Sequence, residues 1–221
     1  MQIQNKLHSY AKLVSEKNLQ INLTAIKNAK SFYEQNILDA LTVKNFSEIK
    51  ASTKIIDIGT GAGIPGIPLA INFPEKNFLL VDSIKKKLNF IDEVIKELDI
   101  KNIKTLHGRI EDIGKNKLYR EKFNLILAKA VAPYSTLLEY AIPLTKIGGY
   151  FYAYKTEKEF SETGIIFIKN AAKIFGSEFL ENRKINNSKD KIISVFRKTN
   201  KTKLVYPRGK NLPRKNPLGY N

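Results

Sequence analysis

Residues 57–66 read Asp57-Ile58-Gly59-Thr60-Gly61-Ala62-Gly63-Ile64-Pro65-Gly66, at the end of a short apolar run. Glycines at this spacing allow a tight turn and let a ligand approach the backbone closely. The proline at position 65 suits the first position of a helix, and the N–H groups that begin a helix are free to face the turn. The stretch therefore predicts a nucleotide-binding turn between a strand and a helix.

The same alternation of short apolar runs and longer helical patterns continues along the chain. Strands are predicted at residues 54–58, 77–81, 103–106, 123–128 and 149–154, and helices at residues 65–72, 84–98, 134–142 and 158–173. This order is typical of a parallel α/β sheet with helices on both faces. Two further runs, at 174–184 and 191–198, are close enough in sequence to pair as antiparallel strands. We therefore expect a doubly wound α/β fold.

The flanking segments differ from this central part. Residues 1–51 place Leu7, Tyr10 and Val14 at helical spacing, which predicts an N-terminal helical lid. Residues 52–198 form the predicted main domain. Residues 199–221 are rich in proline, glycine and basic side chains, which favours an extended basic arm rather than a helix.

The composition limits the classes of function. The 221 residues include 38 Lys and Arg against 21 Asp and Glu, a net charge of +17, and no acidic residue follows Lys191. This excess favours a polyanionic partner such as nucleic acid. The absence of cysteine excludes disulfides and thiolate chemistry, and we expect no metal. Because no apolar run approaches the ~20 residues that span a bilayer, we expect a soluble, cytoplasmic protein, and no heptad pattern suggests more than a monomer.

The glycine pattern leaves more than one nucleotide possible. Gly61, Gly63 and Gly66 satisfy the dinucleotide spacing, but the glycine that directly follows the strand is Gly59, and counting from it places Ile64 where the third glycine belongs. The acidic residue before the turn suits a cationic ligand such as a sulfonium amino acid. S-Adenosylmethionine is therefore favoured over a dinucleotide of an oxidoreductase, and a ligand-free turn comes third.

Two further segments are predicted at the same edge of the sheet. Asp82 ends the second strand, where its carboxylate could bind both ribose hydroxyls; the alternative is that it only caps the next helix. Residues 108–112 follow the third strand and could frame an adenine, or form an ordinary loop.

The exit of the fourth strand, residues 128–133, is expected near the reacting methyl group. Methylation of a pyrimidine carbon needs a cysteine, and the sequence at 132–134 lacks the polar residue and first proline that usually accompany methylation of an exocyclic amine. A ring nitrogen such as guanine N7 needs no general base, so positioning, worth roughly 7 to 11 kcal/mol, could supply most of the rate. Lys129 and Lys155 would then hold the base or a phosphate; otherwise they are solvated lysines. His8 and His107 are interpreted as structural.

These motifs are similar to those of a known family. The chain resembles the small-subunit rRNA guanine-N7 methyltransferases, historically called glucose-inhibited division protein B. The similarity rests on residues 22–26, 37–41, 57–69, 82–83 with Lys86, 129–132, 154–155 and 206–208, and the double proline after the glycine turn is its most specific feature.

The resemblance implies a class I S-adenosylmethionine-dependent methyltransferase with a Rossmann-like, seven-stranded sheet, acting on N7 of guanine 527 of 16S rRNA. The implied substrate is the rRNA, the small ribosomal subunit or its assembly intermediate. Lys129 and Asn36 stand where many members have Arg and His. Together with the motifs above, the resemblance predicts as cofactor-binding residues Asp57, Gly59, Gly61, Gly63, Ile64, Asp82, Ser83, Ile110, Glu111 and Lys129, and as catalytic residues Asn22, Lys129 and Lys155.

The basic C-terminal segment is the predicted RNA contact. Tyr206 or Tyr220 could stack on a base. The phosphate-binding candidates are Lys201, Lys203, Arg208, Arg214 and Lys215. The alternatives are a merely solubilising tail, a non-catalytic RNA-binding module, and a methyltransferase that acts on a different RNA or a small molecule.

Overall fold

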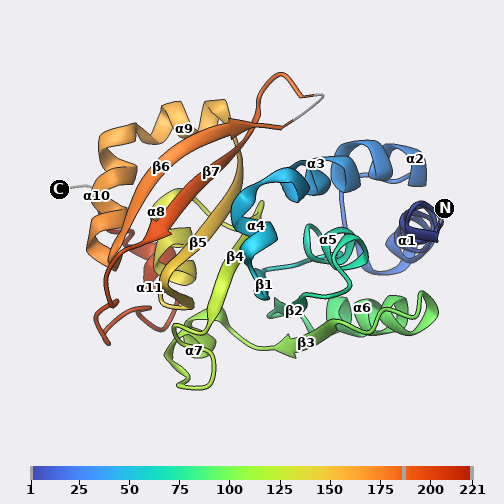
Figure 1. Cartoon of the computed structure of the whole chain (residues 1–221), viewed down its shortest axis with the longest axis horizontal. Helices are drawn as coiled ribbons and strands as arrows, with labels where there is room; N and C mark the ends of the chain where they lie inside the picture. Colours follow the sequence, from blue (N-terminus) through green and yellow to red (C-terminus); the bar gives the residue numbers. More distant parts are fainter. Residues whose placement is uncertain (1, 186–187, 220–221) are drawn as a thin grey trace. The chain divides into compact units, whose positions relative to one another are not determined.

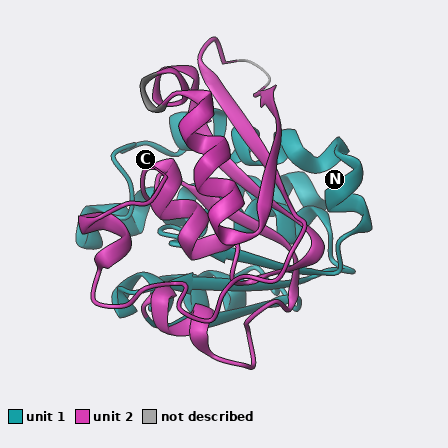
Figure 2. Cartoon of the chain, turned by 90° about the vertical axis from the view of Figure 1, so that its left-hand side faces the viewer, with its two compact units in different colours: residues 1–108 teal, residues 109–221 magenta. Residues whose placement is uncertain are grey.

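The computed structural model describes residues 2–185 and 188–219, so the stacking prediction for Tyr220 lies outside the described residues. The chain forms two compact units, residues 1–108 and 109–221, which Figure 2 distinguishes by colour. Within the described residues, no helix combines the length and the apolar character needed to cross a membrane.

The strands have the order β3-β2-β1-β4-β5-β7-β6 in a seven-stranded sheet (Figure 1). In the first unit, β1 (Lys54–Ile58), β2 (Asn77–Asp82) and β3 (Ile103–His107) are parallel. In the second unit, β4 (Phe123–Lys129) and β5 (Thr145–Thr156) are parallel, whereas β7 (Lys191–Lys198) is antiparallel to both β5 and β6 (Ser177–Lys184). The predicted α/β fold is confirmed.

The first unit begins with helices that pack on one another. α1 (Gln2–Ile21) buries Leu7, Tyr10, Ala11 and Val14, one face of the helix, and contacts α5 (Gly66–Asn72) and α6 (Lys85–Glu97). The segment after α1 contains α2 (Ala29–Phe32), a π-helical turn η1 (Tyr33–Ile37), α3 (Leu38–Leu41), a 3₁₀ turn η2 (Thr42–Asn45) and α4 (Ser47–Ala51). The register pairs Ile58 with Val81 and Asp82 with His107, so the carboxyl ends of β1, β2 and β3 lie at one edge.

In the second unit, the helix predicted over 158–173 is two helices. Thr156 and Glu159 form a capping box that starts α9 (Glu157–Thr163), and Gly164, with φ of 75°, separates it from α10 (Ile165–Phe175). α10 ends at Gly176, which is in the left-handed conformation, so β6 begins at Ser177 rather than at 174. The unit also contains α7 (Ile110–Lys115) and α8 (Tyr134–Ala141), which contact each other.

The C-terminal segment is not a wholly extended arm. Residues 212–215 form a short helix, α11 (Leu212–Lys215), so the prediction of extended structure is wrong there. Proline is tolerated in the first turn of a helix, and the buried Pro213 occupies that place. α11 packs on α8, and Pro207 is buried beside Gly114 of α7. The prolines therefore shape a packed segment of the second unit.

Candidate functional site

The glycine turn follows β1 as predicted. Gly59, Gly61 and Gly63 have φ values of 65°, 60° and 100°, a conformation that residues with a Cβ rarely adopt. A Cβ placed on Gly61 would meet no atom closer than the Gly59 carbonyl oxygen, 4.0 Å away. The backbone at Gly61 therefore lies beside open space, which is what close approach of a ligand requires.

The Asp57 carboxylate braces this turn from inside. It is fully buried, and its Oδ2 accepts hydrogen bonds from Thr60 Oγ1 at 2.6 Å and from the Gly66 amide at 3.0 Å. A Cβ on Gly66 would lie 2.9 Å from the same oxygen, so glycine is required for this approach. The sequence predicted a cofactor contact for Asp57; the contacts found here are with the turn itself.

A tyrosine that the sequence analysis assigned only to packing also holds the turn. The Tyr10 hydroxyl, buried on α1, donates to the Ala62 carbonyl at 2.8 Å. Burial, with a contribution from Asp57, raises the pKa of Tyr10 well above its usual value, so the hydroxyl remains a donor. Helical spacing identified Tyr10 as buried, but no local signal in the sequence identifies its partner 52 residues away.

Asp82 joins the glycine turn to the next helix. Its Oδ2 accepts from the Gly61 amide at 3.0 Å, and its Oδ1 accepts from the Ile84 amide at 2.9 Å, just before α6. Ile84 is the N-cap residue of α6, so Asp82 holds the residue before the helix and does not cap the helix itself. Neither contact excludes ligand binding, because each carboxylate oxygen can accept a second hydrogen bond. Ser83 is exposed, and its carbonyl oxygen lies 3.1 Å from His107 Nε2.

The predicted adenine segment lies in the second unit, where Ile110 begins α7. Glu111 is buried; its carboxylate is 3.2 Å from Arg109 and 3.4 Å from the Tyr140 hydroxyl. Burial and the charge of Glu111 raise the pKa of Tyr140. Glu111 is therefore a fixed, buried carboxylate, as a specific contact requires.

The lysines of the predicted target side differ in their surroundings. Lys129 ends β4 and is half-buried, and the next residue, Ala130, has a φ of 56°. Lys155 has a side chain only 4% exposed; its Nζ donates to the Ala132 carbonyl at 2.7 Å and to Glu159 at 2.6 Å. The alternative of a solvated Lys155 is therefore wrong. Asn22 is exposed, with a φ of 47°, directly after α1.

The basic residues of the C-terminal segment fall into two groups. Lys201, Lys203 and Lys215 are exposed. Arg208 pairs with the buried Glu139, and Arg214, although exposed, donates to the Val131 carbonyl. The first group is exposed, as expected of side chains that bind phosphate, whereas the second group binds groups of the protein.

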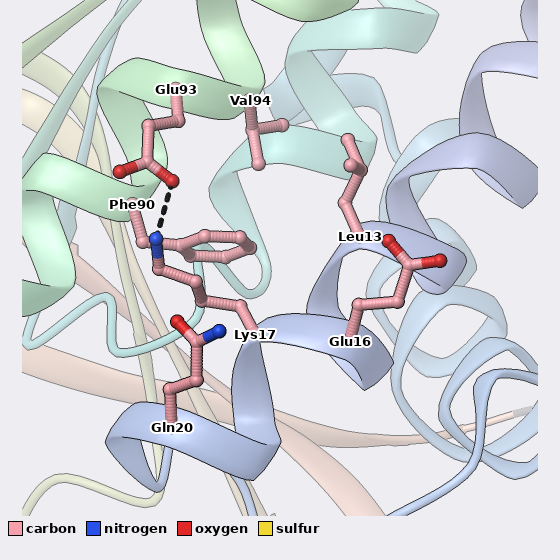
Figure 3. A pocket seen from close by; sticks show the side chains of 7 residues that line it. All are labelled: Leu13, Glu16, Lys17, Gln20, Phe90, Glu93 and Val94. Carbon is pink, nitrogen blue, oxygen red and sulfur yellow. Dashed lines mark hydrogen bonds and ion pairs between the residues drawn. The ribbon is translucent and has the colours of Figure 1, made fainter.

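Two hollows of the first unit lie apart from the predicted site residues. One is lined by α1 and α6 and is bridged by Lys17 and Glu93, whose charged atoms are 2.7 Å apart (Figure 3). The other borders α1 and η1, where His8 stacks on Tyr33 with ring centroids 4.3 Å apart. Their linings contain none of the residues predicted to bind cofactor or RNA.

Comparison with known proteins assigns the chain to a family. The model of the family described as GidB, rRNA small subunit methyltransferase G, matches residues 3–186. The chain belongs to this family. The ribosomal RNA small subunit methyltransferase G of Thermoanaerobacter pseudethanolicus is 41% identical over 212 residues, which cover 95% of this chain and 88% of the relative. The resemblance stated from the motifs is thereby confirmed.

Solved structures agree on the fold. The pre-rRNA processing protein fibrillarin of Methanococcus jannaschii matches with a TM-score of 0.57 at 19% identity, over 73% of this chain and 74% of its own. M. jannaschii TYW2, solved in complex with AdoMet, matches with a TM-score of 0.52 at 19% identity, over 65% of this chain and 66% of its own. The chain has the class I methyltransferase fold, and it is an S-adenosylmethionine-dependent methyltransferase rather than a dinucleotide-dependent oxidoreductase.

Proposed function

We propose that this enzyme methylates N7 of guanine 527 in 16S rRNA of the small ribosomal subunit. The observation that supports the proposal most strongly is the family match over residues 3–186. The net charge of +17 and the exposed Lys201, Lys203 and Lys215 are in accord with an RNA substrate.

The first unit has the groups that the cofactor needs. The glycines 59, 61 and 63 form the turn with positive φ values, the backbone at Gly61 is open to the cofactor's amino-acid part, and Asp82 has acceptor capacity left for a ribose diol. When bound, S-adenosylmethionine supplies an electrophilic methyl group on a positively charged sulfur. Further contacts from Ile64 and Ser83, and from Ile110, Glu111 and Lys129 of the second unit, remain predictions.

The acceptor chemistry explains which groups the chain does not need. Guanine N7 has a lone pair and no proton, so it can attack a methyl carbon without a general base, and the sequence has no cysteine for a covalent route. The work left to the chain is to orient the base and exclude water, which in well-oriented systems is worth roughly 7 to 11 kcal/mol. Lys129 and Asn22 are the proposed donors to the target nucleotide, and Lys155 is proposed to act through its contact with the Ala132 carbonyl.

A transfer assay tests the proposal. The purified chain is incubated with methyl-labelled S-adenosylmethionine and either naked 16S rRNA or intact small subunits. N7-methylguanine is then located by reduction and aniline cleavage. We expect a single labelled guanine, at position 527, and the two substrates show which form the enzyme accepts. Label at another base, or tight cofactor binding with no RNA labelling, contradicts the proposal and favours another RNA or a small-molecule acceptor.

A further inference from the structure

The loop that follows β4 is held at two consecutive carbonyl groups. Lys155 Nζ donates to the Ala132 carbonyl and an Arg214 guanidinium nitrogen donates to the Val131 carbonyl, both at 2.7 Å. Ala130, at the start of the loop, has a φ of 56°, which costs free energy in a residue with a Cβ. Because the backbone alone does not favour this conformation, we infer that the hydrogen bonds from Lys155 and Arg214 stabilise it.

Arg214 reaches Val131 from the C-terminal segment. It lies on α11, whose four residues are far too few to be stable alone, because short helices depend on tertiary contacts. One such contact is the hydrogen bond from Thr136 Oγ1 on α8 to the Pro213 carbonyl, at 2.8 Å, and Pro213 itself is buried. The position of Arg214 therefore depends on how the C-terminal segment packs on α8.

A buried ion pair fixes that packing. Glu139 of α8 has a side chain 1% exposed, and it accepts from the Arg208 guanidinium at distances down to 2.7 Å and from the Arg208 amide at 2.7 Å. The same guanidinium donates to the Asn216 carbonyl at 2.8 Å. This hydrogen bond connects the two ends of residues 208–216. The hydrogen bond to Glu139 raises the pKa of Arg208, so the guanidinium stays charged at neutral pH. We call Glu139 and Arg208 the C-terminal lock.

We propose that Arg214 is a positioning residue, which sets the backbone of residues 130–133 through the Val131 carbonyl and is itself seated by the C-terminal lock. The proposal deepens the proposed function, because it assumes that this loop borders the target base. It also changes the role of two residues predicted to bind RNA: Arg208 and Arg214 order the second unit, whereas Lys201, Lys203 and Lys215 remain for phosphate. The C-terminal segment thereby links RNA contacts to the order of the loop.

Neighbouring positions on α11 give a matched test. Arg214→Met and Lys215→Met each remove one positive charge from the same helix, so they alter long-range attraction for RNA equally. For a positioning residue, Arg214→Met lowers kcat about tenfold or more and leaves KM for 16S rRNA within about threefold, because small displacements near reacting atoms reduce the rate strongly. Lys215→Met has the opposite pattern: KM rises and the salt dependence of binding becomes shallower.

A second readout does not depend on activity. Amide hydrogen exchange at Ala130, Val131 and Ala132 is compared in the parent chain, Arg214→Met, Arg214→Lys, Lys215→Met and the lock variant Arg208→Lys. We expect faster exchange in Arg214→Met and Arg208→Lys, parent-like exchange in Lys215→Met, and partial protection in Arg214→Lys, which keeps a donor.

Two outcomes overturn the proposal. If Arg214→Met and Lys215→Met both raise KM, flatten the salt dependence and leave loop exchange unchanged, Arg214 is an RNA-binding cation only. If exchange rises in Arg214→Met without any loss of kcat, the loop is ordered by Arg214 but does not position the base. Failure of the parent chain to methylate 16S rRNA contradicts the proposed function instead, and the exchange measurement still decides whether Arg214 orders the loop.

Discussion

Two carboxylates at the ends of neighbouring strands determine the conformation of the glycine turn. Asp57 binds the turn at Thr60 and Gly66, and Asp82 binds it at Gly61. The sequence predicted both positions, because carboxyl ends of parallel strands meet at one edge of a sheet. It could not predict that the Thr60 hydroxyl and the Gly61 and Gly66 amides are their partners, since that depends on the local path of the chain.

Asp82→Asn tests this arrangement at a single residue. The two carboxylate oxygens each accept from one backbone N–H, so the amide nitrogen would face either the Gly61 or the Ile84 N–H group and that hydrogen bond is lost. Hydrogen bonds to a charged group contribute about 1.5–3 kcal/mol, so we expect the Kd for S-adenosylmethionine to rise at least tenfold in calorimetric titration. Asp92→Asn, which makes the same change in α6 at its contact with Thr105, is the control and should keep the parent affinity. Equal affinities in all three proteins would contradict the role of Asp82.

Glu121 should make the free energy of unfolding depend on pH in the acidic range. Burial alone raises the pKa of this carboxyl, but the hydrogen bond and charge of Lys198, with smaller contributions from Thr202 and Arg120, hold it below its usual 4.5. A lowered pKa stabilises the folded state above pH 4.5, and this contribution is lost as the pH falls through the folded-state pKa. Glu121→Gln should therefore unfold at lower urea concentration at pH 7, and the difference from the parent should shrink below pH 4.5. A difference that stays constant from pH 7 to pH 3 would contradict this assignment.

At the scale of elements, glycines and contacts between residues distant in sequence determine where helices begin and end, which hydrophobic periodicity does not show. The apolar pattern over 158–173 predicted one helix, but Gly164 divides it, and the capping box of Thr156 and Glu159 fixes the start of the first half. The C-terminal prolines predicted an extended arm, yet α11 forms because it packs on α8. Its lock partner, Glu139, is 69 residues from Arg208, so no local pattern could reveal it.

Helix α1 supports the glycine turn through Tyr10, and removal of one hydroxyl tests the link. Tyr10→Phe leaves the Ala62 carbonyl without this donor, which should lower the free energy of unfolding by about 1–3 kcal/mol and weaken S-adenosylmethionine binding. Urea denaturation and cofactor titration measure the two effects. Tyr33→Phe removes an exposed hydroxyl that accepts from Gln4, and it should change neither quantity appreciably. Similar losses in both variants would show that the Ala62 contact has no special role.

At the scale of the whole molecule, the sequence predicted the alternation of strands and helices and the place of the glycine turn, because both follow from local patterns. The sequence did not show which basic side chains are available to RNA, because that depends on how the C-terminal segment packs. Of the five predicted phosphate contacts, Arg208 and Arg214 hold protein groups, whereas Lys201, Lys203 and Lys215 are exposed. Charge counting could not separate these groups, because it takes no account of buried partners such as Glu139.

The salt dependence of RNA binding tests this division. Lys201, Lys203 and Lys215 are changed together to Gln, and binding of 16S rRNA is measured from low to moderate salt. Each lost phosphate contact reduces the slope of log K against log salt by about 0.7 to 0.9, so we expect a total reduction of about 2 to 3 with unchanged cofactor affinity. The control changes Lys12, Lys96 and Lys104 of the first unit, which are exposed and remove the same charge. If both triple variants alter the slope equally, the C-terminal lysines are not a specific RNA contact.

The measurement that tests the account most directly is the methylation state of guanine 527 in 16S rRNA from a bacterial strain that lacks its own enzyme for this site and expresses this chain. Mass spectrometry of the rRNA fragment should show N7-methylguanine with the parent chain and none with Gly59→Val, because valine does not tolerate a φ of 65° and would distort the turn. An unmethylated guanine with well-expressed parent chain, or full methylation with Gly59→Val, would contradict the account.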